Sequence, residues 1–177
     1  METQVTVGVE RIFSHPNFNE STYDNDIALV QLENRVQFTD YIRPVCLASQ
    51  KYQEDHFLRP NRTGTVTGWG RLGLRAPLAS TLQEIHVPYV NESVCSASTT
   101  YAVTRNMFCA GYVQGEGVKQ DACKGDSGGP LSMQQDGSHY LVGLVSWGEG
   151  CGARDKFGFY TKVANYYAWM MTSMRTA

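Results

Sequence analysis

The sequence predicts an all-β protein with a short α-helix at its C-terminal end. Short apolar runs of β type recur along the 177 residues, 17 glycines are present, and apolar residues at helical spacing occur only near the end. The runs are divided by glycine, proline, asparagine and aspartate. Many short strands divided by turn residues are typical of β-sandwiches and β-barrels.

Few strands are predicted in the first part of the chain. Gln4–Phe13 alternates around three valines and Ile12, and Ile27–Leu32 is a compact apolar run. Two or three strands cannot close a barrel. We therefore expect residues 1–63 to form an incomplete first barrel and the linker that follows it.

The second part contains enough strands for a complete barrel over residues 64–162. The Asp136-Gly137 pair favours a tight hairpin between two of them. The six predicted strands are Gly64–Arg71, Thr81–Val87, Met107–Gly111, Leu131–Gln134, Tyr140–Ser146 and Phe159–Val163.

A helix is predicted over residues 163–177, docked by one apolar face. The residues spaced for that face are Val163, Tyr166, Tyr167, Met170 and Met174.

Composition excludes several function classes. The formal net charge is -2 and no basic block is present, so we expect no nucleic-acid partner. No run of about 18 apolar residues exists, so we expect no transmembrane segment. Met1–Gln4 has neither the basic nor the apolar region of a signal peptide.

Cysteines and glycosylation sequons nevertheless favour a secreted, extracellular protein. The three sequons begin at Asn19, Asn61 and Asn91, and the five cysteines leave one thiol free or paired with another chain. A secreted type of chain without a signal peptide leads us to expect that Met1 is not the true beginning.

The strongest motif is Gly125–Pro130, which reads Gly-Asp-Ser-Gly-Gly-Pro. A nucleophilic serine needs exposure, a tight backbone turn and N–H donors for the developing oxyanion. Ser127 would be that nucleophile, and the N–H groups of Gly125 and Ser127 would converge on the oxyanion. A simple Gly-Ser turn is the alternative, which the full hexapeptide disfavours.

This motif and its context resemble the chymotrypsin family of trypsin-like serine proteases, whose mechanism is a reference case for nucleophilic catalysis. The resemblance spans nearly the whole chain and implies a chymotrypsin-like double β-barrel that requires no cofactor. Asn106–Tyr112 and Ser146–Cys151 are similar to the vitamin K-dependent coagulation proteases of the factor X, IX and VII type. The other matching segments are Asp24–Leu29, Val66–Gly70, Asp121–Pro130, Val145–Gly148 and Gly158–Val163.

The resemblance implies a role for each carboxylate of the site. Asp26 would be the aspartate of the catalytic triad, although in isolation it also suits a helix cap or a turn. Asp121 would form the floor of the primary specificity pocket and select Arg or Lys, unless it is a surface aspartate in a polar loop. Residues implied to wall or open this pocket are Ser146, Trp147, Gly148 and Gly158.

Aromatic residues are implied to line a further subsite. Tyr23, Tyr101 and Trp147 match an aromatic box that suits apolar or cationic groups, with ordinary packing as the alternative. An aromatic at Phe157 is associated in the family with a loop that binds a sodium ion.

The resemblance also implies the disulfides and partners. Cys95 would pair with Cys109 and Cys123 with Cys151, while Cys46 would join a separate light chain or remain a buried free thiol. Protein substrates with Arg or Lys at the cleaved bond, and serine protease inhibitors, are the other expected partners.

The catalytic histidine has no counterpart in this sequence. Its Ala-Ala-His-Cys segment is absent, and we reject His15, His56, His86 and His139 as the base. We also expect Asp126, which pairs with a new N-terminus in the family, to be a buried charge without a partner. The chain alone is therefore expected to be inactive; a non-catalytic binding module and a fragment that does not fold are the alternatives.

Overall fold

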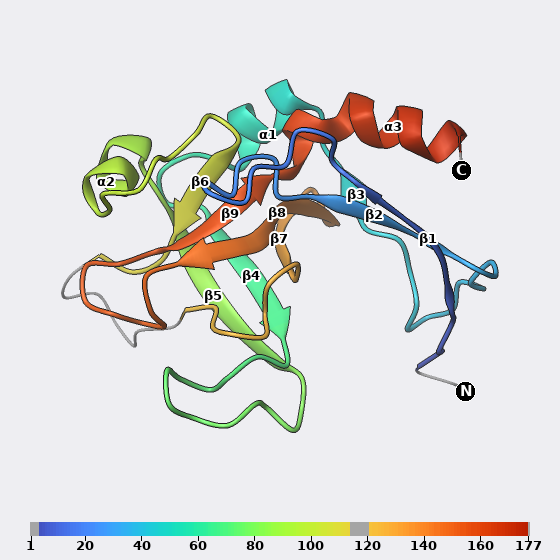
Figure 1. Ribbon diagram of the computed structural model, residues 1–177, viewed down its shortest axis with the longest axis horizontal. Helices are drawn as coiled ribbons and strands as arrows, with labels where there is room; N and C mark the ends of the chain where they lie inside the picture. The colour runs from blue at the N-terminus through green and yellow to red at the C-terminus, as the bar shows by residue number, and fades with distance from the viewer. Residues whose placement is uncertain (1–3, 114–120, 177) are drawn as a thin grey trace.

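A closed antiparallel barrel forms the centre of the molecule. The computed structural model describes residues 4–113 and 121–176. Strand order in the main sheet is β3-β8-β7-β4-β5-β6-β9, and β8 also pairs with β9, which closes six strands into a barrel (Figure 1). Its strands are β4 (Thr63–Gly68), β5 (Gln83–Val90), β6 (Met107–Ala110), β7 (Pro130–Gln135), β8 (Ser138–Gly148) and β9 (Gly158–Lys162). The predicted all-β class is confirmed.

Strand residues that alternate inward fill the barrel, as the pleat of a strand requires. Its core comprises side chains from all six strands, and Phe57, which follows helix α1 (Gln50–His56), packs against them. The largest members that are fully shielded from water are Phe57, Leu131, Met133 and Tyr160.

The hairpin between β7 and β8 has the predicted two-residue turn. Gln135 pairs with Ser138, and Asp136 and Gly137 have φ values of 51° and 76°. Positive φ at both central residues gives a turn whose twist matches that of the strands, which explains the Asp-Gly pair.

Two short helices were not predicted from the sequence. Ser49 caps α1 by accepting from the N–H of Tyr52, and Asn91 caps α2 (Glu92–Ala97) by accepting from the N–H of Ser93. Both caps are polar residues of the type that favours a helix start. Seven and six residues are too few to produce a clear helical period in the sequence.

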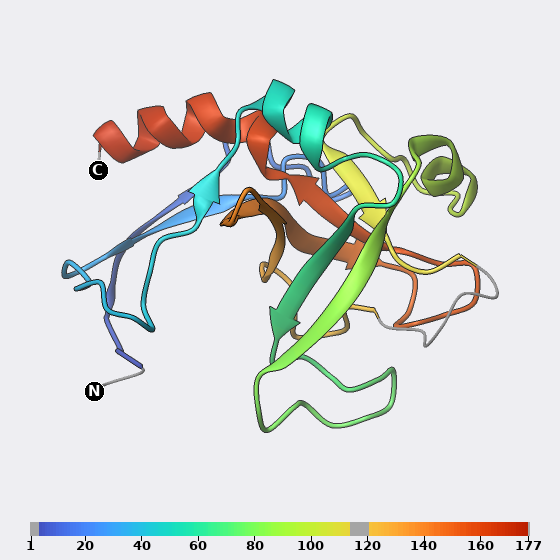
Figure 2. The ribbon, with the colours of Figure 1, turned by 180° about the vertical axis from the view of Figure 1, so that it is seen from behind.

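The first part of the chain forms a small two-stranded sheet rather than a barrel. Among the described residues, β1 (Val9–Ser14) pairs only with β2 (Ala28–Leu32), and β3 (Cys46–Leu47) joins the barrel beside β8. Figures 1 and 2 show this ribbon extending away from the barrel. Several of its aliphatic side chains remain exposed: Val9, Ile12, Val30 and Leu32.

The C-terminal segment docks across both parts. A turn of 3-10 helix, η1 (Val163–Tyr166), leads into α3 (Tyr167–Arg175), and Met170 is buried with Ile27 in a shared cluster. Tyr167 and Met174, which we predicted to lie on the buried face, are exposed. The prediction was wrong there because the first turn is 3-10, which rotates the following residues relative to a continuous α-helix.

Candidate active site

Ser127 lies on a tight, exposed loop between two glycines in the left-handed region. Gly125 has φ +101° and Gly128 has φ +79°. Gly128 donates its N–H to the carbonyl of Val145 at 2.8 Å, which ties the loop to β8. Within the described part of the chain, the N–H groups of Gly125 and Ser127 donate no hydrogen bond. Both donors are therefore free for an oxyanion.

Asp126 has two backbone N–H donors, although no ion pair within the described residues includes it. Its carboxylate accepts from the N–H of Gly70 at 2.8 Å and from that of Cys123 at 2.9 Å. A Cβ on Gly68 or Gly70 would collide with that carboxylate, since its oxygens would lie 2.1 and 2.4 Å away. These contacts hold the serine loop against the end of β4, and the carboxylate is only partly buried.

Asp121 and Ser127 line the same cavity, which has a volume of about 410 Å³. The carboxylate accepts from the N–H of Gly152 at 2.9 Å through Oδ2, whereas Oδ1 is buried without a hydrogen-bond partner. Burial raises the pKa of Asp121 to about 6, and the nearby Asp126 acts in the same direction. A buried carboxylate oxygen without a hydrogen-bond donor favours the binding of a cationic side chain.

Two glycines keep the cavity narrow but open. A Cβ on Gly158 would lie 3.0 Å from Oδ1 of Asp121. A Cβ on Gly148 would lie 3.9 Å from the Cα of Gly158, on the facing wall. Ser146 and Trp147 also line the cavity, so all four predicted wall residues meet there.

Asp26 is held against the barrel by two hydroxyl groups. Its Oδ2 accepts from the hydroxyl of Ser146 at 2.6 Å, and its backbone carbonyl accepts from that of Thr161 at 2.8 Å. Ser146 lines the cavity that Asp121 and Ser127 also line, so this hydrogen bond links Asp26 to a residue of the cavity wall.

The neighbour Asp24 anchors the segment that carries Asp26. It accepts from the hydroxyl of Thr104 at 2.6 Å and from the amide of Asn106 at 2.9 Å. Burial acts to raise the pKa of Asp24, but these hydrogen bonds outweigh it and hold the pKa below its usual value. Sequence reasoning missed this anchor, since its partners lie about 80 residues away.

The three aromatic residues that were predicted to line one subsite do not all line the same cavity. Tyr101 and Trp147 make an edge contact with ring centroids 5.9 Å apart, and Trp147 stacks on Phe159 at 3.8 Å. Tyr23 lines the cavity with Trp147 and is 47% exposed. Tyr101 does not line that cavity.

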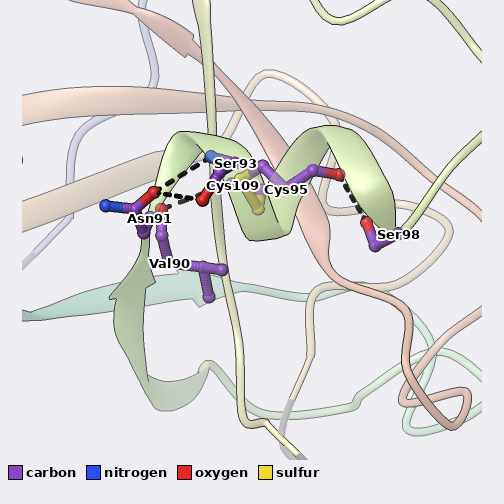
Figure 3. Close-up of a disulfide and its surroundings, with 6 residues drawn as sticks. All are labelled: Val90, Asn91, Ser93, Cys95, Ser98 and Cys109. Atoms are coloured by element: carbon purple, nitrogen blue, oxygen red, sulfur yellow. Dashed lines mark hydrogen bonds between the residues drawn. A yellow bond between two sulfur atoms is a disulfide. The ribbon is translucent and has the colours of Figure 1, made fainter.

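Both disulfides implied by the resemblance are present, Cys95–Cys109 and Cys123–Cys151. Figure 3 shows the first of them beside Asn91, the capping residue of α2. The second joins the loop of Asp121 to the facing wall of the cavity. Such a link between pocket walls limits their motion in the unfolded and folded chain alike.

The remaining thiol and the sequon asparagines are accessible. Cys46 is free and exposed, which excludes the alternative of a buried thiol. The side chains of Asn19, Asn61 and Asn91 are all exposed. Their glycosylation stays a prediction.

None of the four histidines lines the cavity of Ser127 in the part of the chain that the structure describes. His15 packs against aromatic rings of the C-terminal segment, and His56 stacks on the aromatic ring of Tyr52 in α1. His86 and His139 lie on β5 and β8. The site thus combines a serine, a carboxylate slot and a held aspartate.

A closed antiparallel barrel that presents an exposed serine beside a buried carboxylate is typical of the class of serine hydrolases. Residues 1–170 match the trypsin family, and the chain belongs to that family of serine proteases. Within the described residues, no helix has the length and apolar character needed to cross a membrane.

Proposed function

We propose that this chain carries the specificity pocket and nucleophile of a serine endopeptidase that cleaves after Arg or Lys. One observation carries the proposal: Oδ1 of Asp121 is buried without a partner in the cavity that Ser127 also lines. A guanidinium or ammonium ion would supply the missing donor. Ser127 would then attack the carbonyl beside that side chain, while the N–H groups of Gly125 and Ser127 stabilise the oxyanion.

The reaction also needs a base, and we propose that it comes from residues outside this sequence. Asp26 would orient that base and stabilise its cation. The exposed aliphatic residues of β1 and β2 support the same view, because further strands would cover them. The chain alone is then inactive, or retains roughly 10³–10⁴-fold catalysis over water at most.

A non-catalytic module that binds partners through the intact pocket is the second candidate. The formed slot favours it for the isolated chain, because cation binding needs Asp121 but no base. The expected partners are the same for both candidates: protein segments with Arg or Lys and serine protease inhibitors.

Two measurements on the recombinant chain test these proposals. Fluorescence of 4-aminobenzamidine reports cation binding, and a fluorophosphonate probe reports an activated serine. Binding without labelling supports the intact pocket and the missing base. Absence of 4-aminobenzamidine binding from a chain that melts cooperatively contradicts the pocket, and labelling of Ser127 contradicts the need for an external base.

The finer assignments are proposals that rest on the resemblance. They are a coagulation-type protease, secretion, a light chain linked through the exposed Cys46, and glycans on the three sequons. A sodium ion near Phe157 would need backbone carbonyl ligands, because that ring is buried and has no ligand atom.

A further inference from the structure

Two residues of the loop between β1 and β2 have a backbone conformation that residues with side chains rarely adopt. Tyr23 and Asn25, on either side of Asp24, have φ values of 57° and 58°. Figures 1 and 2 show this loop against β9, where the carbonyl of Asp26 accepts from the hydroxyl of Thr161. Left-handed backbone at a tyrosine costs free energy, so neighbouring contacts must hold it, and such residues cluster at functional sites.

Asp24 supplies the contacts that hold this backbone. Its Oδ1 accepts from the hydroxyl of Thr104 at 2.6 Å and from the amide of Asn106 at 2.9 Å, and its Oδ2 accepts from the amide of Asn25 at 3.2 Å. Its backbone carbonyl accepts from the N–H of Asn19 at 3.0 Å, which closes the loop on itself. One partly buried carboxylate thus ties the strained loop to a segment about 80 residues later in the chain.

That segment, residues 98–106, carries an aromatic residue of the candidate site. Tyr101 makes an edge contact with Trp147, with ring centroids 5.9 Å apart. Trp147 and Tyr23 line the cavity of the candidate nucleophile. Asp24 therefore joins two segments that each reach an aromatic wall of the cavity, one through Tyr23 beside it and the other through the contact of Tyr101 with Trp147.

Other side-chain contacts fix the loop less directly to residues 98–106. The amide of Asn25 donates to the carbonyl of Asn17 at 2.9 Å, and its oxygen accepts from the hydroxyl of Tyr166 at 3.2 Å. The amide of Asn106 also reaches that oxygen, at the longer distance of 3.4 Å. Because Asp24 makes the two shorter bonds to the segment, its loss should release Tyr23 from its place in the wall.

We propose that Asp24 is a positioning residue that fixes Tyr23 relative to Trp147 and thereby selects ligands with an aromatic group next to the basic group in the slot. The inference rests on the proposed function, because Asp121 would hold the basic group. An aromatic group that lies against two rings gains edge and stacking contacts in addition to burial. Asp24 is not among the residues that line the cavity, so it acts through Tyr23 and touches no ligand.

A matched pair of arginine ligands tests the proposal by calorimetry on the full chain. They are Nα-acetyl-arginine amide and Nα-(2-naphthoyl)-arginine amide, which differ in one aromatic group. We expect the naphthoyl ligand to bind about tenfold more tightly, because one aromatic group that becomes buried can supply that factor. Asp24→Ala should reduce this ratio to about one, whereas 4-aminobenzamidine, which occupies only the slot, should bind as before.

Three further variants separate positioning from general support of the fold. Asp24→Asn keeps Oδ1 as an acceptor and should restore most of the ratio; a ratio of one there would contradict positioning through Oδ1. Thr104→Val removes one donor to Asp24 and should also lower the ratio, and it decides the question if Asp24→Ala does not fold. Asp40→Ala is the matched control, since this exposed carboxylate bonds to Arg43 of its own loop, and it should leave the ratio at about tenfold.

The remaining outcomes distinguish the possible failures. A ratio that is unchanged in Asp24→Ala and Thr104→Val overturns this inference while the pocket stands. A parallel loss of affinity for all three ligands in Asp24→Ala also overturns it, because Asp24 would then support the fold as a whole. Equal binding of the two arginine ligands to the parent chain would show that the rings select nothing. If the parent chain does not bind 4-aminobenzamidine, the proposed function fails and this inference fails with it.

Discussion

The hydroxyl of Ser146 donates to Oδ2 of Asp26 at 2.6 Å, across 120 residues of sequence. This bond joins the first part of the chain to β8 of the barrel, at the cavity that contains Ser127. It gives a partly buried carboxylate a donor in the absence of a base.

Ser146→Ala should therefore destabilise the chain. Removing the donor leaves Asp26 with one unsatisfied carboxylate oxygen, and we expect the free energy of unfolding to fall by about 1–3 kcal/mol. Urea denaturation measures the change. Thr172→Ala serves as the control, since its hydroxyl bonds only within α3; equal effects of the two substitutions would contradict the proposed importance of the Asp26 contact.

Asp121→Asn should weaken 4-aminobenzamidine binding without destabilising the fold. Loss of one partner of a buried charge pair costs about 2–5 kcal/mol, which corresponds to roughly 30-fold or more in affinity. The free protein loses a carboxylate with one unpartnered oxygen, so its melting temperature at pH 7 should not fall. A variant that binds the ligand as tightly as the parent would show that Asp121 does not select the cation.

Affinity for 4-aminobenzamidine should decrease as the pH falls below about 6, the pKa of Asp121. Protonation removes the charge that the cation needs, so each further pH unit should cost about tenfold in affinity. The contribution of Asp121 to the free energy of folding has the opposite pH dependence. It is fully present below the usual aspartate pKa of 3.8, and it is lost as the pH rises through about 6. Titration of ligand fluorescence from pH 4.5 to 8, with Asp121→Asn as the flat control, checks the first effect.

Gly158→Ala should obstruct the floor of the slot. Its Cβ would lie 3.0 Å from Oδ1 of Asp121 and 3.1 Å from the hydroxyl of Tyr160, where the cation would bind. We expect the affinity for 4-aminobenzamidine to fall about tenfold, which is on the order of 1.4 kcal/mol. Gly73→Ala is the matched control, because its Cβ would meet only Ala76 at 3.7 Å. Unchanged affinity in Gly158→Ala would place the cation elsewhere.

Cys46 should be the thiol that reacts in the native chain. It is exposed, whereas the other four cysteines form two disulfides. Iodoacetamide without reductant should add one group per chain by mass spectrometry, and Cys46→Ser should add none. Labelling that persists in Cys46→Ser would mean that a disulfide is open in solution.

Local patterns were sufficient to predict much of the fold and to nominate candidate site residues. Asp136-Gly137 specifies its turn because both residues tolerate positive φ, and six separated apolar runs were enough to predict a barrel. The segment around Ser127 indicated a candidate nucleophile because its glycines permit a tight, exposed turn. Such signals lie within a few residues of one another, so a linear sequence contains them.

The tertiary structure alone decided which groups meet. Asp126 accepts one of its two backbone hydrogen bonds from Gly70, 56 residues away, a partner that the sequence did not indicate. The same holds for Asp26 with Ser146 and for the position of Leu74 at the mouth of the slot. These relationships depend on how the barrel closes and how its loops pack, and long-range pairing of this kind leaves no periodic pattern in the sequence.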